Sequence, residues 1–177
     1  MIEKKMLRRD IRARLSSISY DKKVECSKNL CNVLESRILE CGAKVVALFS
    51  PLSDEPQIFS LVERLSQKMT VVLPRVEGDT MQFYCYSCEN MVSGSFGIME
   101  PVGEEAVAPC SIDVIVVPGV AFTMKGERLG RGKGFYDKYM SASGFRAIKI
   151  GVCYTEQVCD CLPVEPHDLR MDSVVHS

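Results

Sequence analysis

Short apolar runs, separated by segments with helical spacing, are the feature that most constrains the fold of this chain. The runs cover residues 44–50, 70–73 and 112–117, and the last continues to Val120. Strands buried on both faces of a parallel sheet are near-continuously apolar, because neither face meets water. Pro74 is expected to end the second of these strands. Further strands are predicted at 81–86 and 146–152.

Between the apolar runs the chain has the spacing of amphipathic helices. Helices are predicted at 2–16, from Ser19 to about Glu40, at 57–68 and at 135–142. In the first helix Leu7, Ile11 and Leu15 recur every four residues on one face. The stretch 87–111 is expected to be irregular, and the tail 155–177 to hold only short elements and loops.

This alternation of strands and helices predicts an α/β protein. Residues 1–177 are expected to form a single-domain layered fold with a mainly parallel central sheet flanked by helices. In such folds ligands bind beyond the carboxyl ends of the strands. The loops 51–56, 74–75 and 118–134 all follow predicted strands, so they are expected to gather along one edge of the sheet.

Composition excludes several classes of partner. The net charge of −1 provides no overall positive field that would recruit nucleic acid. No run approaches the ~20 apolar residues of a membrane helix, and residues 1–9 lack the apolar core of a secretory signal. The nine cysteines are therefore expected to be reduced thiols in the cytoplasm.

The segment 126–139 combines four glycines with the cations Arg128, Arg131 and Lys133, between a predicted strand and a predicted helix. Such loops hold phosphate, because bare backbone N–H groups approach the oxygens and a helix end adds partial positive charge. Gly134 follows Lys133, where a Walker A loop has serine or threonine. The plainer alternative is a flexible surface turn with solvated charges.

Other charged residues have a functional and a plainer interpretation. Asp137 could hold magnesium against bound phosphates or simply favour a helix start. The basic face of Lys4, Lys5, Arg8 and Arg9 could meet a polyanion or only solvent, and Asp54-Glu55 could bind a substrate ring or cap a helix. Arg75 could face a site or lie on the surface. His167 is interpreted as a polar loop residue, and Asp168 as a possible second metal carboxylate.

Two cysteine pairs raise the possibility of a zinc or redox site. They are Cys85 with Cys88 and Cys159 with Cys161. Residues three apart in a strand point to opposite faces, and no helix is predicted to start at Cys88. Reduced structural cysteines are the favoured interpretation.

The string Val117-Pro-Gly-Val-Ala-Phe122, followed by Gly126-x-Arg-Leu-Gly-Arg-Gly-Lys-Gly-Phe-Tyr-Asp137, resembles the 5-formyltetrahydrofolate cyclo-ligase family. The resemblance extends over nearly the whole chain. It includes the basic N-terminal helix, Asp54-Glu55, Pro74-Arg75, Phe96-Gly-Ile-x-Glu-Pro101, Ile150-Gly-Val-x-Tyr154 with Gln157, and His167-Asp168.

The resemblance implies an enzyme, monomeric or weakly associating, that uses ATP and Mg²⁺. It would convert 5-formyltetrahydrofolate to 5,10-methenyltetrahydrofolate and release ADP and phosphate. Phosphoryl transfer depends on positioning and charge neutralisation more than on a protein nucleophile. Arg131 and Lys133 are the candidates for catalytic residues that neutralise the transferring phosphoryl group.

The resemblance also implies binding residues, carried over position by position. ATP would be contacted by Lys4, Lys5, Arg8, Arg128, Leu129, Gly130, Arg131, Gly132, Lys133, Gly134, Phe135 and Tyr136. The folate would be contacted by Ser50, Glu55, Arg131, Gly132, Lys133, Gly134 and Phe135. Asp137 and Asp168 match the magnesium carboxylates of the family.

Two positions depart from the family pattern. Phe135 stands where tyrosine is frequent, and Thr123 stands where aspartate is common. Two other hypotheses remain open at this point. One is a folate- or nucleotide-binding protein without catalysis, which the intact loop charges disfavour. The other is a thiol-based metal or redox module.

Overall fold

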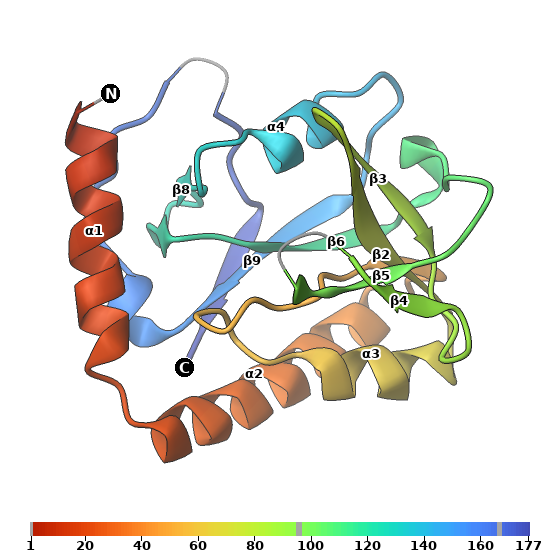
Figure 1. Ribbon diagram of the computed structural model, residues 1–177, viewed down its shortest axis with the longest axis horizontal. Coiled ribbons are helices and arrows are strands. Elements are labelled where there is room, and N and C mark those ends of the chain that lie inside the picture. Colours follow the sequence, from red (N-terminus) through yellow and green to blue (C-terminus); the bar gives the residue numbers. More distant parts are fainter. Residues whose placement is uncertain (1, 95–96, 166–167) are drawn as a thin grey trace.

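The computed structural model describes residues 2–94, 97–165 and 168–177. A central six-stranded sheet has helices on both of its faces, which confirms the predicted α/β fold with a mainly parallel sheet (Figure 1). The strands are β1 (Val45–Ala47), β2 (Thr70–Glu77), β3 (Thr80–Cys85), β6 (Val114–Pro118), β9 (Ile148–Cys153) and β10 (Ser173–His176). Their order across the sheet is β10-β9-β6-β1-β2-β3.

Five strands run parallel, and only the edge strand β3 is antiparallel to its neighbour β2. The expectation that Pro74 ends β2 is wrong, since the strand continues to Glu77. Pairing of β2 with β1 stops at Val72, so the missing N–H of Pro74 costs no ladder bond on that side. The edge strand β10 lies inside the tail where only short elements were predicted.

The predicted helices are present, with shifts at their ends. They are α1 (Ile2–Ser16), α2 (Tyr20–Glu40), α3 (Phe59–Ser66) and α4 (Phe135–Met140). The Ser19 hydroxyl caps α2 by accepting a hydrogen bond from the Lys22 N–H, at 3.3 Å. Helices α2 and α3 cover one face of the sheet, α4 covers the other, and α1 stands at one side (Figure 1).

The core follows from the alternation of side chains along the strands. Val46 and Leu48 pack with α2 and α3, whereas Ala47 belongs to the cluster that includes Tyr139 of α4. Ile11 and Leu15 of α1 pack against Tyr154 in a third cluster. The apolar face predicted for the first helix therefore fixes α1 beside the carboxyl end of β9.

Short elements fill the segments that were expected to be irregular. An antiparallel ribbon of β4 (Met91–Ser93) and β5 (Met99–Pro101) lies within 87–111. A second ribbon, β7 (Ala121–Phe122) with β8 (Arg128–Leu129), carries the chain from β6 into the glycine loop. Two 3₁₀ turns, Pro109–Ser111 and Thr155–Gln157, precede β6 and follow β9.

The ring of Phe122 lies between Gly119, which directly follows β6, and Gly151, which lies within β9. A Cβ added at Gly119 would lie 2.7 Å from the ring, and one added at Gly151 would lie 2.6 Å from it. Phe122 is fully buried, so the ring has no free space into which it can move. These glycines therefore let Phe122 seat the β7–β8 ribbon on the sheet.

We predict that Gly151→Ala destabilises the protein by roughly 1 to 3 kcal/mol, because the new methyl group overlaps the buried ring. Denaturant unfolding measures the difference. In a Phe122→Leu background the same change is expected to cost less, since the overlapping ring atoms are gone. An equal cost in both backgrounds would show that Phe122 is not the group that excludes a side chain here.

Candidate active site

A cavity of about 990 Å³ opens beyond the carboxyl ends of β1 and β6. Cations and carboxylates line it where α1, the glycine loop and the tail meet. Apolar side chains of β2 and β3, together with Ile98, line it elsewhere. Helix α1 and the β4–β5 ribbon stand at opposite sides of the molecule (Figure 1). The cavity therefore has a charged end and a more apolar end.

Arg128 is the most deeply buried cation of the cavity, with a side chain only 4% exposed. Its guanidinium donates to Asp137 at 2.7 Å and to the Pro118 carbonyl at 3.2 Å. The Arg128 Nε has no hydrogen-bond partner in the described part of the chain. The pair with Asp137 offsets the cost of holding this charge away from water.

Arg131 joins the glycine loop to the loop after β1. Its Nε donates to Glu55 at 3.0 Å, and its Nη2 contacts Asp54. Burial raises the pKa of Glu55, although the Leu52 N–H and Arg131 act in the opposite direction. The predicted capping role of Asp54-Glu55 is not what the structure shows, because these carboxylates hold Arg131 and α3 begins at Phe59.

Lys4 of α1 lies between two carboxylates of the tail. Its ammonium donates to Asp168 at 2.7 Å and to Glu165 at 2.8 Å. Burial lowers the pKa of Lys4, but these two hydrogen bonds outweigh it, so the net pKa is raised. Arg8, one turn further along α1, donates to the Gly130 carbonyl at 2.8 Å. Of the predicted basic face, Arg8 therefore contacts the glycine loop and Lys4 contacts the tail, whereas Lys5 and Arg9 are exposed.

The glycine loop takes a conformation that only glycine adopts easily. Gly132 and Gly134 have φ angles of +107° and +69°. Lys133 between them is exposed, and its ammonium makes no hydrogen bond or ion pair within the described ranges. Helix α4 spans only six residues, so its dipole adds less than the predicted eight-residue helix would. Backbone N–H groups and side-chain cations have to supply most of the positive potential.

Other predicted site residues also line the cavity: Ser50, Leu129, Gly130, Phe135, Tyr136, Asp137 and Asp168. Lys5 is exposed and lies outside the cavity lining. Arg75 also lies outside it and donates to the carbonyls of Pro101 and Gly103. Thr123 is buried in the turn between β7 and β8, where its hydroxyl meets Glu127. His167 lies outside the described residues.

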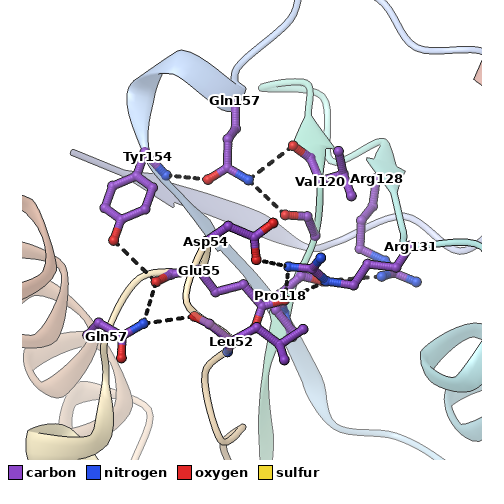
Figure 2. A network of polar contacts seen from close by, with 11 residues as sticks. Leu52, Asp54, Glu55, Gln57, Pro118, Val120, Arg128, Arg131, Tyr154 and Gln157 are labelled. Carbon is purple, nitrogen blue, oxygen red and sulfur yellow. Dashed lines mark hydrogen bonds and ion pairs between the residues drawn. The ribbon is translucent and has the colours of Figure 1, made fainter. Parts of the chain in front are cut away.

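A buried network that the sequence did not reveal supports this site (Figure 2). The Gln157 amide donates to the carbonyls of Gly119 and Val120 at 2.8 and 3.0 Å. Its oxygen accepts the Tyr154 N–H at 2.9 Å, and the Tyr154 hydroxyl meets the Glu55 carbonyl at 3.2 Å. The network joins the loops after β1, β6 and β9. A buried glutamine gives no periodic signal, and the family resemblance named Gln157 together with Tyr154 without indicating what it contacts.

The structure gives little to support a thiol or multi-ligand metal site. All nine cysteines are free thiols, and Cys85 and Cys88 are exposed. Across the residues that the structure describes, no three His, Cys, Asp or Glu side chains are grouped to hold a metal ion. Asp137 and Asp168 both line the cavity, but each is engaged by a cation. Such a pair suits a metal held mainly by a bound phosphate.

Comparison with known proteins points to one family. The sequence model of the 5-formyltetrahydrofolate cyclo-ligase family matches residues 1–177. The 5-formyltetrahydrofolate cyclo-ligase of Mus musculus is 26% identical over 188 residues, covering 98% of this chain and 93% of its own.

Two solved structures are similar over almost the whole chain. The NMR structure of Aquifex aeolicus 5,10-methenyltetrahydrofolate synthetase has a TM-score of 0.87 at 34% identity, covering 98% of this chain and 89% of its own. A 5,10-methenyltetrahydrofolate synthetase from Mycoplasma pneumoniae has a TM-score of 0.79 at 26% identity, covering 97% of both chains. In the part of the chain described here, no helix is both long and apolar enough to span a membrane.

We predict that Gln157→Leu destabilises the protein by roughly 2 to 4 kcal/mol, because two buried carbonyls and one buried N–H lose their partner. Chemical denaturation measures the loss. Gln67→Leu is the control, since Gln67 is exposed at the end of α3, and it is expected to change stability by less than about 0.5 kcal/mol. Similar effects of the two changes would contradict the structural role given to Gln157.

Proposed function

The chain belongs to the 5-formyltetrahydrofolate cyclo-ligase family, and we propose that it converts 5-formyltetrahydrofolate to 5,10-methenyltetrahydrofolate using ATP. ADP and phosphate are the other products. One observation carries this proposal beyond family membership: a single cavity combines a cation-rich glycine loop with a more apolar end. A phosphate donor and a ring-bearing acceptor can therefore meet in one cavity.

The reaction requires activation of an unreactive group. The oxygen of a formamide is a poor leaving group, so the terminal phosphoryl group of ATP is transferred to it. The neighbouring folate nitrogen then attacks the activated carbon, the ring closes, and phosphate departs. The enzyme has to hold the reacting groups together and neutralise charge, and no protein nucleophile is required.

The proposed ATP contacts lie at the charged end of the cavity. Lys4 and Arg8 of α1, with Lys5 beside them, would meet the phosphates together with the loop from Arg128 to Tyr136. Lys133 and Arg131 would neutralise the transferring phosphoryl group. Lys133 is suited to this role because it is exposed and has no partner among the described residues. Arg131 would exchange contacts with Asp54 for contacts with phosphate.

The proposed folate contacts are Ser50, Glu55 and the loop from Arg131 to Phe135. Glu55 would act on the folate while it also orients Arg131, because one of its oxygens accepts from that arginine. Phe135 lines the cavity without a hydroxyl group, so it offers the substrate packing only.

Magnesium is part of this proposal. Asp137 and Asp168 fit such an ion chemically, since Mg²⁺ in phosphoryl-transfer sites uses one or two carboxylates together with substrate phosphates. When bound, the ion would neutralise phosphate charge. Arg128 and Lys4, which now engage these carboxylates, would then have hydrogen bonds to offer to ATP. We further propose a monomeric or weakly associating protein in the cytoplasm.

The test of this function is the absorbance of methenyltetrahydrofolate while the protein is mixed with 5-formyltetrahydrofolate, ATP and Mg²⁺. We expect the band to grow only when ATP is present, with one ADP released for each product formed. A flat trace from folded protein would instead favour a binding protein without catalysis. A calorimetric titration with ATP and with the folate would then be the deciding measurement.

We predict that Lys133→Ala lowers kcat roughly 100-fold or more, because a preorganised charge on the transferring phosphoryl group is lost. The side chain is exposed, so the thermal unfolding temperature should stay within a degree or two of wild type. Lys125→Ala, an exposed lysine in the same loop region, is the control and should keep full activity. Turnover of the Lys133 variant at the wild-type rate would remove this residue from the mechanism.

A further inference from the structure

Glu100 of β5 is a buried carboxylate that the proposed reaction leaves without a role. It lines the cavity, yet the residue is only 6% exposed. Its Oε1 is fully buried and has no hydrogen-bond partner among residues 2–94, 97–165 and 168–177. The same ranges provide no ion pair for this carboxylate. An unpaired buried carboxylate costs free energy, so the protein gains from it only when a ligand supplies donors.

The backbone around Glu100 is fixed from both sides. The Ser50 hydroxyl donates to the carbonyl of Met99, and Arg75 donates to the carbonyl of Pro101 at 3.2 Å. Glu100 also pairs with Val92 across the β4–β5 ribbon. The carboxylate is therefore presented from a constrained backbone, as a group that recognises a ligand has to be.

Because Gly94 has no side chain, the side chain of Glu100 can lie against it. A Cβ added at Gly94 would overlap the carboxylate of Glu100 and the Cγ next to it. Gly94 does not have a left-handed φ angle, so a glycine is needed here for the room that it gives and not for its backbone conformation. A neighbour without a side chain is thus necessary for the observed placement of this acid.

The surroundings of Glu100 suit a flat ring more than a phosphate. Nearby lining residues include Pro74, Val76, Met81 and Ile98, all apolar. A carboxylate repels phosphate, and all but one of the cations that line the cavity belong to α1 and the glycine loop. The exception is Lys138 of α4, which donates to the Asp79 carbonyl at 3.4 Å. Helix α1 lies across the molecule from the β4–β5 ribbon (Figure 1). Glu100 therefore marks the end of the cavity that takes an uncharged, hydrogen-bonding ring.

We propose that Glu100 is the residue that recognises the pteridine ring of the folate, by accepting hydrogen bonds from its 2-amino group and its N3–H. This inference rests on the proposed function. The pteridine edge offers two adjacent donors, which match the two oxygens of one carboxylate. The terminal torsion of glutamate is soft, so either oxygen can turn toward the ring. The adenine edge offers its amino donor beside an acceptor nitrogen, which a carboxylate repels.

The decisive variant is Glu100→Gln, which keeps the shape and replaces one acceptor with a donor. Calorimetry should show the Kd for 5-formyltetrahydrofolate rising about tenfold or more, with the Kd for ATP changed less than twofold. The free variant should be at least as stable to heat as wild type, because an unpaired buried charge is gone. Glu104→Gln, an exposed acid four residues later, is the control and should leave both Kd values unchanged.

A modified ligand separates recognition from a structural role. The 2-desamino-2-methyl analogue of 5-formyltetrahydrofolate lacks one of the two donors, so wild type and Glu100→Gln should bind it with nearly equal Kd values. A structural role for Glu100 would instead weaken both ligands alike. Unchanged folate affinity in Glu100→Gln, or a loss confined to ATP, would overturn the assignment while the ATP-dependent product of the wild type still stands. A wild type that forms no methenyl product would overturn the proposed function as well.

Discussion

The pairing of buried cations with buried carboxylates is the constraint on which the site depends. Arg128, with Asp137, places positive charge where water has little access. The Arg131 side chain is 31% exposed and is held by the buried carboxylate of Glu55. Moving such charges out of water costs several kcal/mol each unless partners compensate. The carboxylates therefore make a cationic cavity compatible with folding. They also keep the guanidinium groups oriented until phosphate oxygens compete for the same donors, which strengthens any interaction made in that enclosed space.

Those ion pairs need three loops to be held in register. Asp137 belongs to α4, and Glu55 belongs to the loop after β1. Both arginines belong to the segment after β6. Gln157 fastens the chain at Gly119 and Val120, and Tyr154 reaches the Glu55 carbonyl. Phe122, wedged against Gly151, fixes the ribbon that carries Arg128. Backbone hydrogen bonds and tight packing therefore set the distances at which the charges act.

Sequence patterns could predict the parallel sheet, since runs such as 112–117 are apolar on both faces. They could also predict the glycine loop, since its glycines and cations lie together in one short segment of the sequence. They could not predict β10, because Ser173–His176 becomes a strand only by pairing with β9. Gln157 and Glu100 carry no periodic signal, and their roles arise from burial beside distant segments. The prediction that Pro74 ends β2 was wrong because a proline interrupts a sheet only where its N–H would have bonded to a neighbouring strand. At Pro74, β2 no longer pairs with β1.

The two buried glutamates of the cavity show why contacts within the protein are an incomplete guide to function. Glu55 is fully engaged, by the Leu52 N–H and by Arg131, so its burial is compensated in the free protein. Glu100 is buried to a similar degree, and its Oε1 has no hydrogen-bond partner among the residues that the structure describes. A chain under pressure for stability alone would place an apolar side chain there. A ligand that brings the missing donors would compensate this carboxylate, so the stability cost and the recognition have one physical origin.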